Sequence, residues 1–393
     1  MLDNHTDSNL ISFVYNESFD KKNLLLALDG EPQSRRKIGS LSNRLLRMID
    51  QSYSPLLYQP MSREITIFPI NVFYLKRAII VPDSYELFWA PWLADGSFSY
   101  PTASCQKEWK RRYQMAHNAV HNGNELKNLI SAERFAGIRH VTCSKPKVCL
   151  KSHIDSDNYW HWTFEWAPRL LRIKEFLVGQ SIDVRDVFFF YVGSRLNRFQ
   201  QEWIERIFPG VHVAHFPDGI SCNRLVWGNI SFTTHHCSRQ IKELSDCIVD
   251  EDSQAICRTK RNSVVFIERG NSKNGRNISN ASDLQRLLKK HGICSVRMDG
   301  LSVYEQAQIF RNSDMIIGPH GSAFVNMIYC TPGTKVLEIF GPGYLPGHDL
   351  VLADSCGLQW ECVIGCSTDG VAEFHSDFKV DTLELEKRIM KMC

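Results

Sequence analysis

The chain has 393 residues, of which 43% are hydrophobic and 23% charged, with a formal net charge of +3 at pH 7. This length exceeds one typical hydrophobic core, so we expect two domains, and the small charge argues against nucleic acid as the main partner. No apolar stretch is long enough to span a membrane, and the first ten residues do not resemble a signal peptide. We therefore expect a cytoplasmic protein, with peripheral contact at the cytoplasmic face of the inner membrane left open.

The first part of the chain is polar and mixed. Residues 1–60 form a lead-in whose best helix candidate is residues 41–49, and strand-like segments then fill residues 64–92. A helical pattern covers residues 106–129 and contains a basic stretch at residues 107–112. That stretch is either a solvated helix face or a contact for anionic substrate or lipid.

Alternating strands and helices follow. Residues 148–150 end a strand, and the aromatic-rich residues 158–170 predict a helix. Residues 187–192 are a continuous apolar run typical of a buried strand, and a helix at 198–208 and a strand at 211–214 come next. We assign residues 61–249 to one α/β domain on this alternation.

A second alternating series fills the rest of the chain. Residues 250–262 are charged and polar and predict a linker, so the second domain covers residues 263–393. Its strands are predicted at 264–268, 294–298, 314–317 and 335–340, and its helices at 283–291, 303–312, 323–330 and 383–392. Two such series predict an α/β fold of two Rossmann-like domains facing across a cleft.

A glycine turn in the second domain is the clearest candidate binding feature. Gly318 and Gly321 bracket Pro319 and His320, and Ser322 is expected to cap the helix that follows. Backbone N–H groups at a helix N-terminus suit a phosphate, and His320 is placed to donate to a diphosphate. Two glycines three residues apart are a weak motif, so the spacing alone leaves a purely structural turn open.

Two arginines follow the first strand of this domain. Arg269 and Arg276 lie in one polar loop, where guanidinium groups match the oxygens of a diphosphate, and Lys273 adds charge. The alternative is an exposed basic loop. Glu338 lies in an apolar strand, where an unpaired carboxylate is costly, so we expect it to accept from ribose hydroxyls or to pair with a loop arginine.

A second candidate group lies on the aromatic helix of the first domain. Asn158, His161 and Glu165 have the spacing of one helical face. A carboxylate beside an imidazole can orient it and raise its basicity, as a general base requires. The alternative is a half-buried structural helix with one internal hydrogen bond.

Cysteines do not indicate a metal site. The chain has 13 of them, and no pair has the Cys-x-x-Cys spacing. Cys222 with His235, His236 and Cys237 matches no standard zinc spacing, so we predict free thiols in a reducing cytosol and no metal.

Three blocks together resemble glycosyltransferase family 61. They are residues 158–170 (NYWHWTFEWAPRL), residues 268–280 (ERGNSKNGRNISN) and residues 301–342, which carry Gln306, His320-Gly321, Asn326 and Glu338 in order. Ser322 departs from the small residue, such as Ala, that usually follows His-Gly in the family. The predicted donor-binding residues are Arg269, Arg276, Asn280, Gln306, Gly318, His320, Gly321, Ser322, Asn326 and Glu338.

The resemblance implies a GT-B architecture whose second domain holds a nucleotide-sugar, with a UDP-sugar the expected donor. It also implies inverting, metal-independent hexosyl or pentosyl transfer to a glycan or glycolipid acceptor, with His161 and Glu165 as catalytic candidates. The Asp-x-Asp at Asp155 and Asp157 is then coincidental. Bacterial members suggest capsular or surface polysaccharide biosynthesis. Two rivals remain: a non-catalytic nucleotide-sugar-binding subunit, and a pyruvyl-type transferase on a similar scaffold.

Overall fold

The computed structural model describes residues 2–3, 24–28, 34–37, 64–67, 72–80, 139–141, 143–150, 157–193, 195–228, 238–249, 264–270, 275–368, 370 and 376–392. The chain divides into two compact units, which we describe separately. Unit 1 comprises Met1–Ser34 and Phe68–Thr233, and unit 2 comprises Arg35–Ile67 and Thr234–Cys393. The predicted helices at 41–49 and 106–129, the basic stretch at 107–112 and the linker at 250–262 lie outside the described residues.

Unit 1 contains a mixed sheet. Among the described residues eight strands join it, in the order β1-β6-β10-β7-β8-β9, with β5 on β10 and β2 on β5. Strands β7 to β10 run parallel to their neighbours, whereas β5 is antiparallel to β10. The strands are β1 (Leu2–Asp3), β2 (Leu24–Leu28), β5 (Val72–Ile80), β6 (Arg139–Val141), β7 (Lys147–Cys149), β8 (Phe188–Val192), β9 (Val213–Phe216) and β10 (Ile220–Gly228).

The aromatic segment of unit 1 forms a helix, as predicted, and this helix is longer than expected. It comprises α6 (Tyr159–His161), a π-helical turn η4 (Trp162–Trp166) and α7 (Ala167–Gly179). Trp162 and Trp166 are fully buried, and α7 packs against β10 and β5. The short helix η5 (Val184–Asp186) follows, and the predicted helix near residue 200 is confirmed as α8 (Arg198–Ile207).

Unit 2 contains a five-stranded parallel sheet in the order β12-β11-β13-β14-β15. The strands are β11 (Val264–Glu268), β12 (Cys294–Arg297), β13 (Met315–Pro319), β14 (Lys335–Phe340) and β15 (Gln359–Ile364). β12 follows β11 in the chain but lies on the other side of β11 from β13. The order in which strands are added to the sheet therefore reverses at the boundary between β11 and β13. That arrangement is the doubly wound fold predicted for this part of the chain, and ligands of such sheets bind at the switch point.

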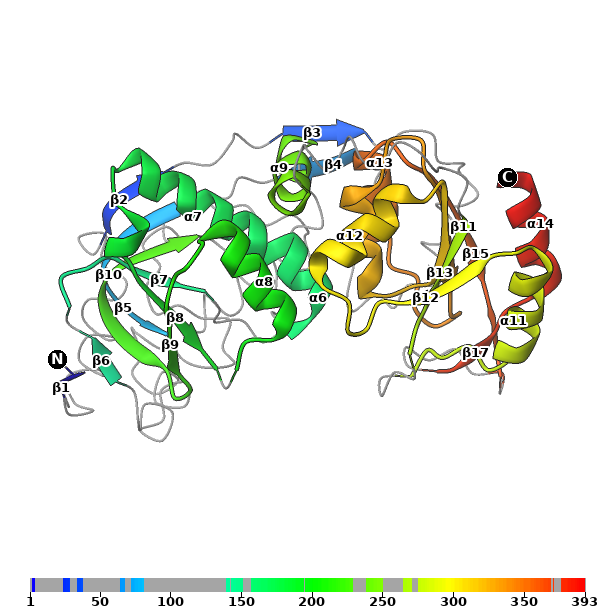
Figure 1. Cartoon of the computed structure of the whole chain (residues 1–393), viewed down its shortest axis with the longest axis horizontal. Coiled ribbons are helices and arrows are strands. Elements are labelled where there is room, and N and C mark those ends of the chain that lie inside the picture. Colours follow the sequence, from blue (N-terminus) through cyan, green and yellow to red (C-terminus); the bar gives the residue numbers. More distant parts are fainter. Residues whose placement is uncertain are drawn as a thin grey trace, which may run out of the picture. The chain divides into compact units, whose positions relative to one another are not determined.

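Helices cover both faces of this sheet, as Figure 1 shows for α11 and α14 on one side and α12 and α13 on the other. A core cluster joins Leu284 and Leu288 of α11 and Leu385 of α14 to Phe266 and Ile317. The helices are α9 (Ser238–Ile248), α11 (Ala281–Lys290), α12 (Val303–Asn312), the 3₁₀ helix η7 (Ser322–Tyr329), α13 (His348–Ser355) and α14 (Thr382–Met392). Two small ladders pair β16 (Cys366–Ser367) with β17 (Phe378–Lys379), and β3 (Ser34–Lys37) with β4 (Glu64–Ile67).

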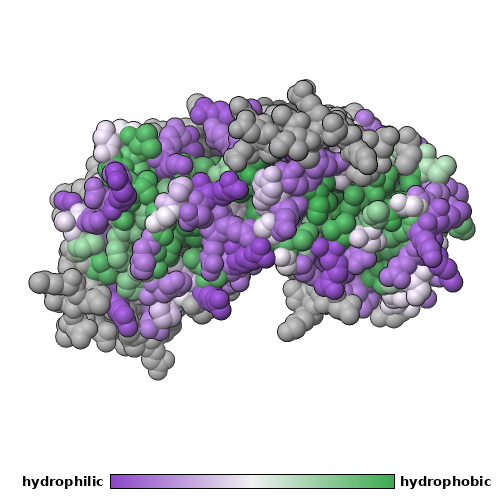
Figure 2. Space-filling view, viewed as in Figure 1, coloured by the Kyte–Doolittle hydropathy of each residue, from purple (hydrophilic) through white to green (hydrophobic). Residues whose placement is uncertain are grey.

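Few of the large apolar side chains that the structure describes are exposed. In the described part of the chain these are Val178 on α7, Tyr304 on α12, and Leu383 and Met390 on α14. Figure 2 shows hydrophilic and hydrophobic residues intermixed over the visible face. None of the described helices combines the length and apolarity that a membrane crossing requires.

A candidate functional site at the switch point of unit 2

The switch point brings the predicted arginine loop and glycine turn together. Arg269 directly follows β11 and His320 directly follows β13, so both lie at the carboxyl ends of neighbouring strands. The Nη1 atom of Arg269 donates a hydrogen bond to the backbone oxygen of His320 at 2.6 Å. Two segments 51 residues apart in sequence therefore meet where ligands of this fold bind.

The two glycines of the turn have different environments. Gly318 lies inside β13, paired with Glu338 of β14, so the prediction that it begins the turn was wrong. The strand continues through Pro319, and a Cβ at position 318 would lie 2.9 Å from the backbone oxygen of Ile267. Gly318 thus permits close packing of β13 against β11. Gly321, with φ of 177°, has extended backbone and is the N-cap of η7.

Ser322 is the first residue of η7, so the prediction that it caps the following helix was wrong. The extended backbone at Gly321 places the cap one residue earlier. This helix is 3₁₀ rather than α, and its residues from Phe324 to Tyr329 are buried. The amide of Phe324 donates to the oxygen of Gly321 at 3.0 Å, which closes the first 3₁₀ turn.

Arg276 is held beside this turn by an unusual backbone. Its φ is +62°, and that of the preceding Gly275 is +66°. Its guanidinium carbon lies 4.8 Å from the ring centre of Tyr344. Burial and the charge of Arg276 lower the pKa of Arg269 to about 10, and burial also lowers the pKa of Arg276. An anion bound between these arginines would relieve both effects.

Hydrogen bonds to Asp377 and Val380 hold the loop that carries Arg276 in place. The backbone and side-chain amides of Asn277 donate to Asp377 Oδ1 at 2.8 and 2.9 Å. Asn280, a predicted donor-binding residue, exchanges two hydrogen bonds of 2.9 Å with the backbone of Val380. The amide of Asn280 therefore fixes the loop. Lys273 lies outside the described residues.

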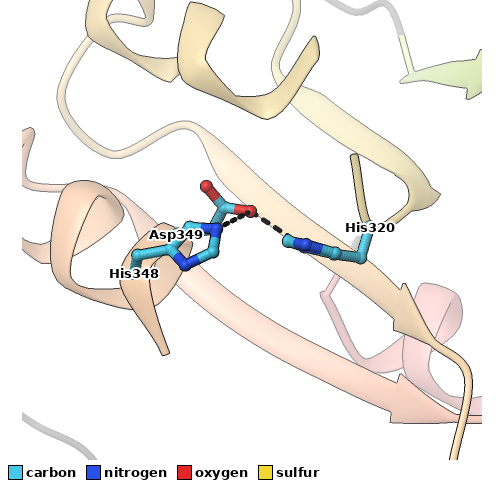
Figure 3. A group of neighbouring side chains, drawn as sticks. All are labelled: His320, His348 and Asp349. Carbon is cyan, nitrogen blue, oxygen red and sulfur yellow. Dashed lines mark ion pairs between the residues drawn. The ribbon is translucent and has the colours of Figure 1, made fainter. Parts of the chain in front are cut away.

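His320 lies in a buried cluster of charged and polar side chains. Its Nδ1 atom is 2.6 Å from Glu338 Oε1 and 3.0 Å from Asp349 Oδ2. Trp360 Nε1 donates to the other oxygen of Glu338 at 3.0 Å. Figure 3 shows Asp349 between His320 and His348, whose Nε2 lies 3.8 Å from the same Asp349 oxygen. The prediction that Glu338 pairs with a loop arginine was wrong, because its oxygens contact His320 and Trp360 instead.

The pKa values of the ionisable groups in this cluster are shifted in different directions. Burial, together with the nearby Asp349 carboxylate, raises the pKa of Glu338 to about 8. Burial opposes ionisation of Asp349, but His348 and His320 outweigh it and lower the pKa of Asp349 to about 2. Burial also opposes charge on His320, yet its hydrogen bonds to the Asp349 and Glu338 oxygens leave its pKa raised. These shifts favour the charged form of His320, the carboxylate form of Asp349 and the protonated form of Glu338.

Sequence reasoning missed Asp349 and Tyr344. Both lie beyond residue 342, where the last block that resembles the family ends. The signal was the His348-Asp349 pair that begins α13 after a loop rich in Gly and Pro.

The same cluster contains metal-ligating atoms. Those of His320, His348 and Asp349 lie within 4.8 Å of one another. In this structure His320 Nδ1 is engaged by Glu338 Oε1 at 2.6 Å, which is a hydrogen-bond distance. We therefore describe the cluster as a hydrogen-bonded network.

Gln306 and Asn326, two further predicted donor-binding residues, contact each other. Asn326 Nδ2 donates to Gln306 Oε1 at 3.1 Å, and Gln306 Nε2 donates to the oxygen of Leu301 at 3.2 Å. Both side chains are buried. Their amides therefore join α12 to η7, the helix that begins at the glycine turn.

The two candidate catalytic residues of unit 1 lie next to each other. His161 Nδ1 lies 3.0 Å from Glu165 Oε2, and the Glu165 side chain is 5% exposed against 33% for His161. Asn158 instead caps the helix, because its side chain accepts from the amide of Trp160 at 2.8 Å. The π-helical turn at Trp162–Trp166 contains Glu165, and such turns are frequent at functional sites.

Comparison with known proteins agrees with the resemblance seen in the sequence. Residues 159–337 match the family model Glycosyltransferase 61, which spans a little under half of the chain. The matched segment contains His161, Glu165, Arg269, Arg276 and His320 and ends one residue before Glu338. No curated protein matches the chain. The match supports a glycosyltransferase 61 domain in this part of the sequence.

Proposed function

We propose that the chain is a glycosyltransferase that moves a sugar from a nucleotide-sugar donor to a hydroxyl of a glycan or glycolipid acceptor. The observation that carries this proposal is the meeting of Arg269 and His320 at the switch point, within the segment that matches the family. A pair of arginines at this position suits a diphosphate, which is the common element of most nucleotide-sugars.

The donor diphosphate is proposed to lie against Arg269, Arg276 and the His320–Ser322 turn. Negative charge develops on this leaving group as the bond to the sugar breaks, and preset donors stabilise that charge. The two guanidinium groups would supply this stabilisation without a metal ion. Transfer would therefore be metal-independent.

The acceptor hydroxyl must lose a proton as it attacks the anomeric carbon from the face opposite the nucleotide, which gives inversion. His161 or Glu165 is the proposed general base, because their 3.0 Å contact allows the carboxylate to orient and polarise the imidazole. The two-domain GT-B arrangement, with these residues acting on a donor held by unit 2, is part of the proposal.

Several finer elements come from the family resemblance alone. A UDP-sugar as donor, hexosyl or pentosyl transfer, a role in capsular or surface polysaccharide biosynthesis, and a cytoplasmic location near the inner membrane remain proposals. A non-catalytic nucleotide-sugar-binding subunit is the main rival, and it would keep the arginines without needing the His161–Glu165 pair. A pyruvyl-type transferase is the other.

A donor screen tests the proposal. Thermal shift with UDP-, GDP-, dTDP- and CMP-sugars, followed by hydrolysis assays on the hits, should give stabilisation by at least one diphosphate donor. CMP-sugars carry a single phosphate and serve as the matched control, since two arginines should favour a diphosphate. Calorimetry in EDTA should give unchanged affinity. Binding that disappears in EDTA and returns with manganese would contradict the metal-independent mechanism.

A further inference from the structure

The geometry points to Asp349 as the residue that keeps His320 in its imidazolium form, so that the switch point presents a third positive group beside Arg269 and Arg276. This inference rests on the proposed function, because it assigns His320 to the diphosphate of the donor. Asp349 acts through His320 and is therefore a positioning residue.

His320 is fixed from several directions. Its amide donates to the oxygen of Ile339 at 2.8 Å, and its own oxygen accepts from Arg269 at 2.6 Å. Its ring stacks on Phe340 with centres 5.2 Å apart and an angle of 19°, and the ring of Tyr344 is inclined to it by 64° with centres 5.3 Å apart. The ring therefore cannot turn without breaking contacts to the sheet, and Tyr344 links it to Arg276.

The direction of the ring makes its protonation state decisive. Nδ1 faces the two carboxyl groups, so Nε2 lies on the opposite edge of the ring. In a neutral imidazole whose Nδ1 carries the proton, Nε2 is an acceptor and would repel phosphate oxygens. In the imidazolium both nitrogens donate, so the same ring would bind a phosphate through a charge-assisted hydrogen bond.

The charged surroundings identify Asp349 as the group that holds this proton in place. The titratable and charged groups facing His320 are Glu338 from β14, Asp349 and His348 from α13, Tyr344 from the loop before α13, and Arg269 after β11. The positive charge of Arg269 disfavours an imidazolium, so a carboxylate is required to keep it.

Two carboxyl groups compete for this role, and both are 0% exposed. One imidazolium cannot compensate two buried carboxylates, so one of them stays protonated. His348 lies 3.8 Å from Asp349 and favours its ionised form, whereas Glu338 accepts only from the neutral indole of Trp360 on its other oxygen. Asp349 thus carries the charge, although Glu338 lies closer to His320.

The first experiment needs no variant. The parent protein labelled with ¹⁵N-histidine is titrated by NMR, and the His320 signals are assigned by their loss in His320→Gln. The ring should be protonated at pH 7. A His320 ring that is neutral at pH 7 would overturn the inference, whatever the protein's activity.

The second experiment compares two carboxyl variants. Asp349→Asn should lower the pKa of His320 by a unit or more, and Glu338→Gln should lower it less. Glu386→Gln is the matched control, because it removes a carboxylate on α14 that lies 2.6 Å from another histidine, His291, which caps the end of α11. An unchanged His320 pKa in folded Asp349→Asn would overturn the inference.

The third experiment uses inorganic pyrophosphate and UDP as probes, with affinity measured by calorimetry from pH 6 to pH 9. Affinity of the parent should fall as pH rises through the His320 pKa. Asp349→Asn should bind about tenfold more weakly at pH 7, equivalent to about 1.4 kcal/mol. A parent that binds neither probe yet has a charged His320 would overturn the proposed function and the ligand assigned here. A parent that binds both with a neutral His320 would overturn the role of Asp349 alone.

Discussion

At the scale of single residues, Gly318 and Gly321 have the same apparent role in the sequence, but the physical reason for a glycine differs between the two positions. Gly318 is required by its strand, because the backbone of β11 occupies the space of a side chain. Gly321 has only Arg269 Nη1, at 3.6 Å, and Pro319 O, at 3.8 Å, near the position of a Cβ. The second glycine therefore has room for a methyl group, and its effect should be on the site rather than on the sheet.

We expect Gly318→Ala to destabilise unit 2 by about 1–3 kcal/mol, because the added Cβ would meet Ile267 O at 2.9 Å and force β13 away from β11. Gly321→Ala is the control. It should leave the free energy of unfolding within about 0.5 kcal/mol of the parent, since its contacts are ordinary. Urea unfolding followed by circular dichroism measures both. Equal destabilisation by the two substitutions would contradict this assignment.

Arg276→Ala should weaken binding of a nucleoside diphosphate by about 1.5–3 kcal/mol, the contribution of a hydrogen bond to a charged group. Arg269→Ala should do the same, and the double variant should lose less than the sum if both arginines hold one diphosphate. Arg311→Ala, at a half-buried arginine of α12, is a control of the same residue type. Calorimetry measures the affinity of each variant for the nucleoside diphosphate. An affinity of Arg276→Ala equal to that of the parent would mean that the loop only covers the sheet.

At the scale of elements, the regular strands and helices of unit 2 could be predicted from sequence because their apolar periods are clean. The strand at Lys335–Phe340 and the helix at Val303–Asn312 have the predicted bounds. Ser302 and Glu305 exchange the hydrogen bonds of a capping box, which fixes where that helix begins.

The features of the site that could not be predicted from sequence are contacts between distant segments of the chain. The amide pair of Gln306 and Asn326 and the meeting of His320 with Asp349 join elements 20 or more residues apart. The local pattern around Asn326 is equally compatible with a ligand contact. The site's residue types were thus predictable, but their partners were set by the order of the strands.

The helical element of unit 1 gives a third prediction. His161→Ala and Glu165→Gln should reduce sugar transfer by about 10²–10⁴, the usual cost of losing a general base, while nucleotide affinity stays near that of the parent. Glu175→Gln, which removes a carboxylate paired with Arg172 on the same helix, is the matched control. Turnover and melting temperature are measured on one preparation.

Turnover and melting temperature together distinguish a catalytic role of His161 and Glu165 from a role in packing. A variant that melts far below the parent and loses transfer only in proportion to its unfolded fraction would support a structural role for the pair. A folded variant that transfers at the parent rate would remove His161 and Glu165 from the mechanism. The binding-subunit alternative predicts no transfer even in the parent.

At the scale of the whole molecule, the buried cluster should set how stability depends on pH. Glu338 has a folded pKa of about 8 against an ordinary value of 4.5, and the pKa of His320 is also raised. The folded protein therefore binds more protons than the unfolded chain, so the stability from these groups is complete below pH 4.5 and is lost as pH rises through about 8. Asp349 has the opposite sign: its contribution is present above pH 3.8 and is lost as pH falls through about 2.

We accordingly expect the free energy of unfolding to be greatest at mildly acidic pH and to decrease from pH 6 to pH 9. Urea unfolding at pH 5.5, 7 and 9 measures this. Glu338→Gln should flatten the decrease, because glutamine keeps the shape of the protonated carboxyl and has no proton to lose. Glu386→Gln should leave the slope between pH 6 and pH 9 unchanged, since the pKa of Glu386 is lowered by Lys290 and His291 and its linkage acts only at acidic pH. A parent whose stability rises steadily from pH 6 to pH 9 would mean that Glu338 is ionised in the folded protein, and the charge distribution assigned to the cluster would then have to be reversed.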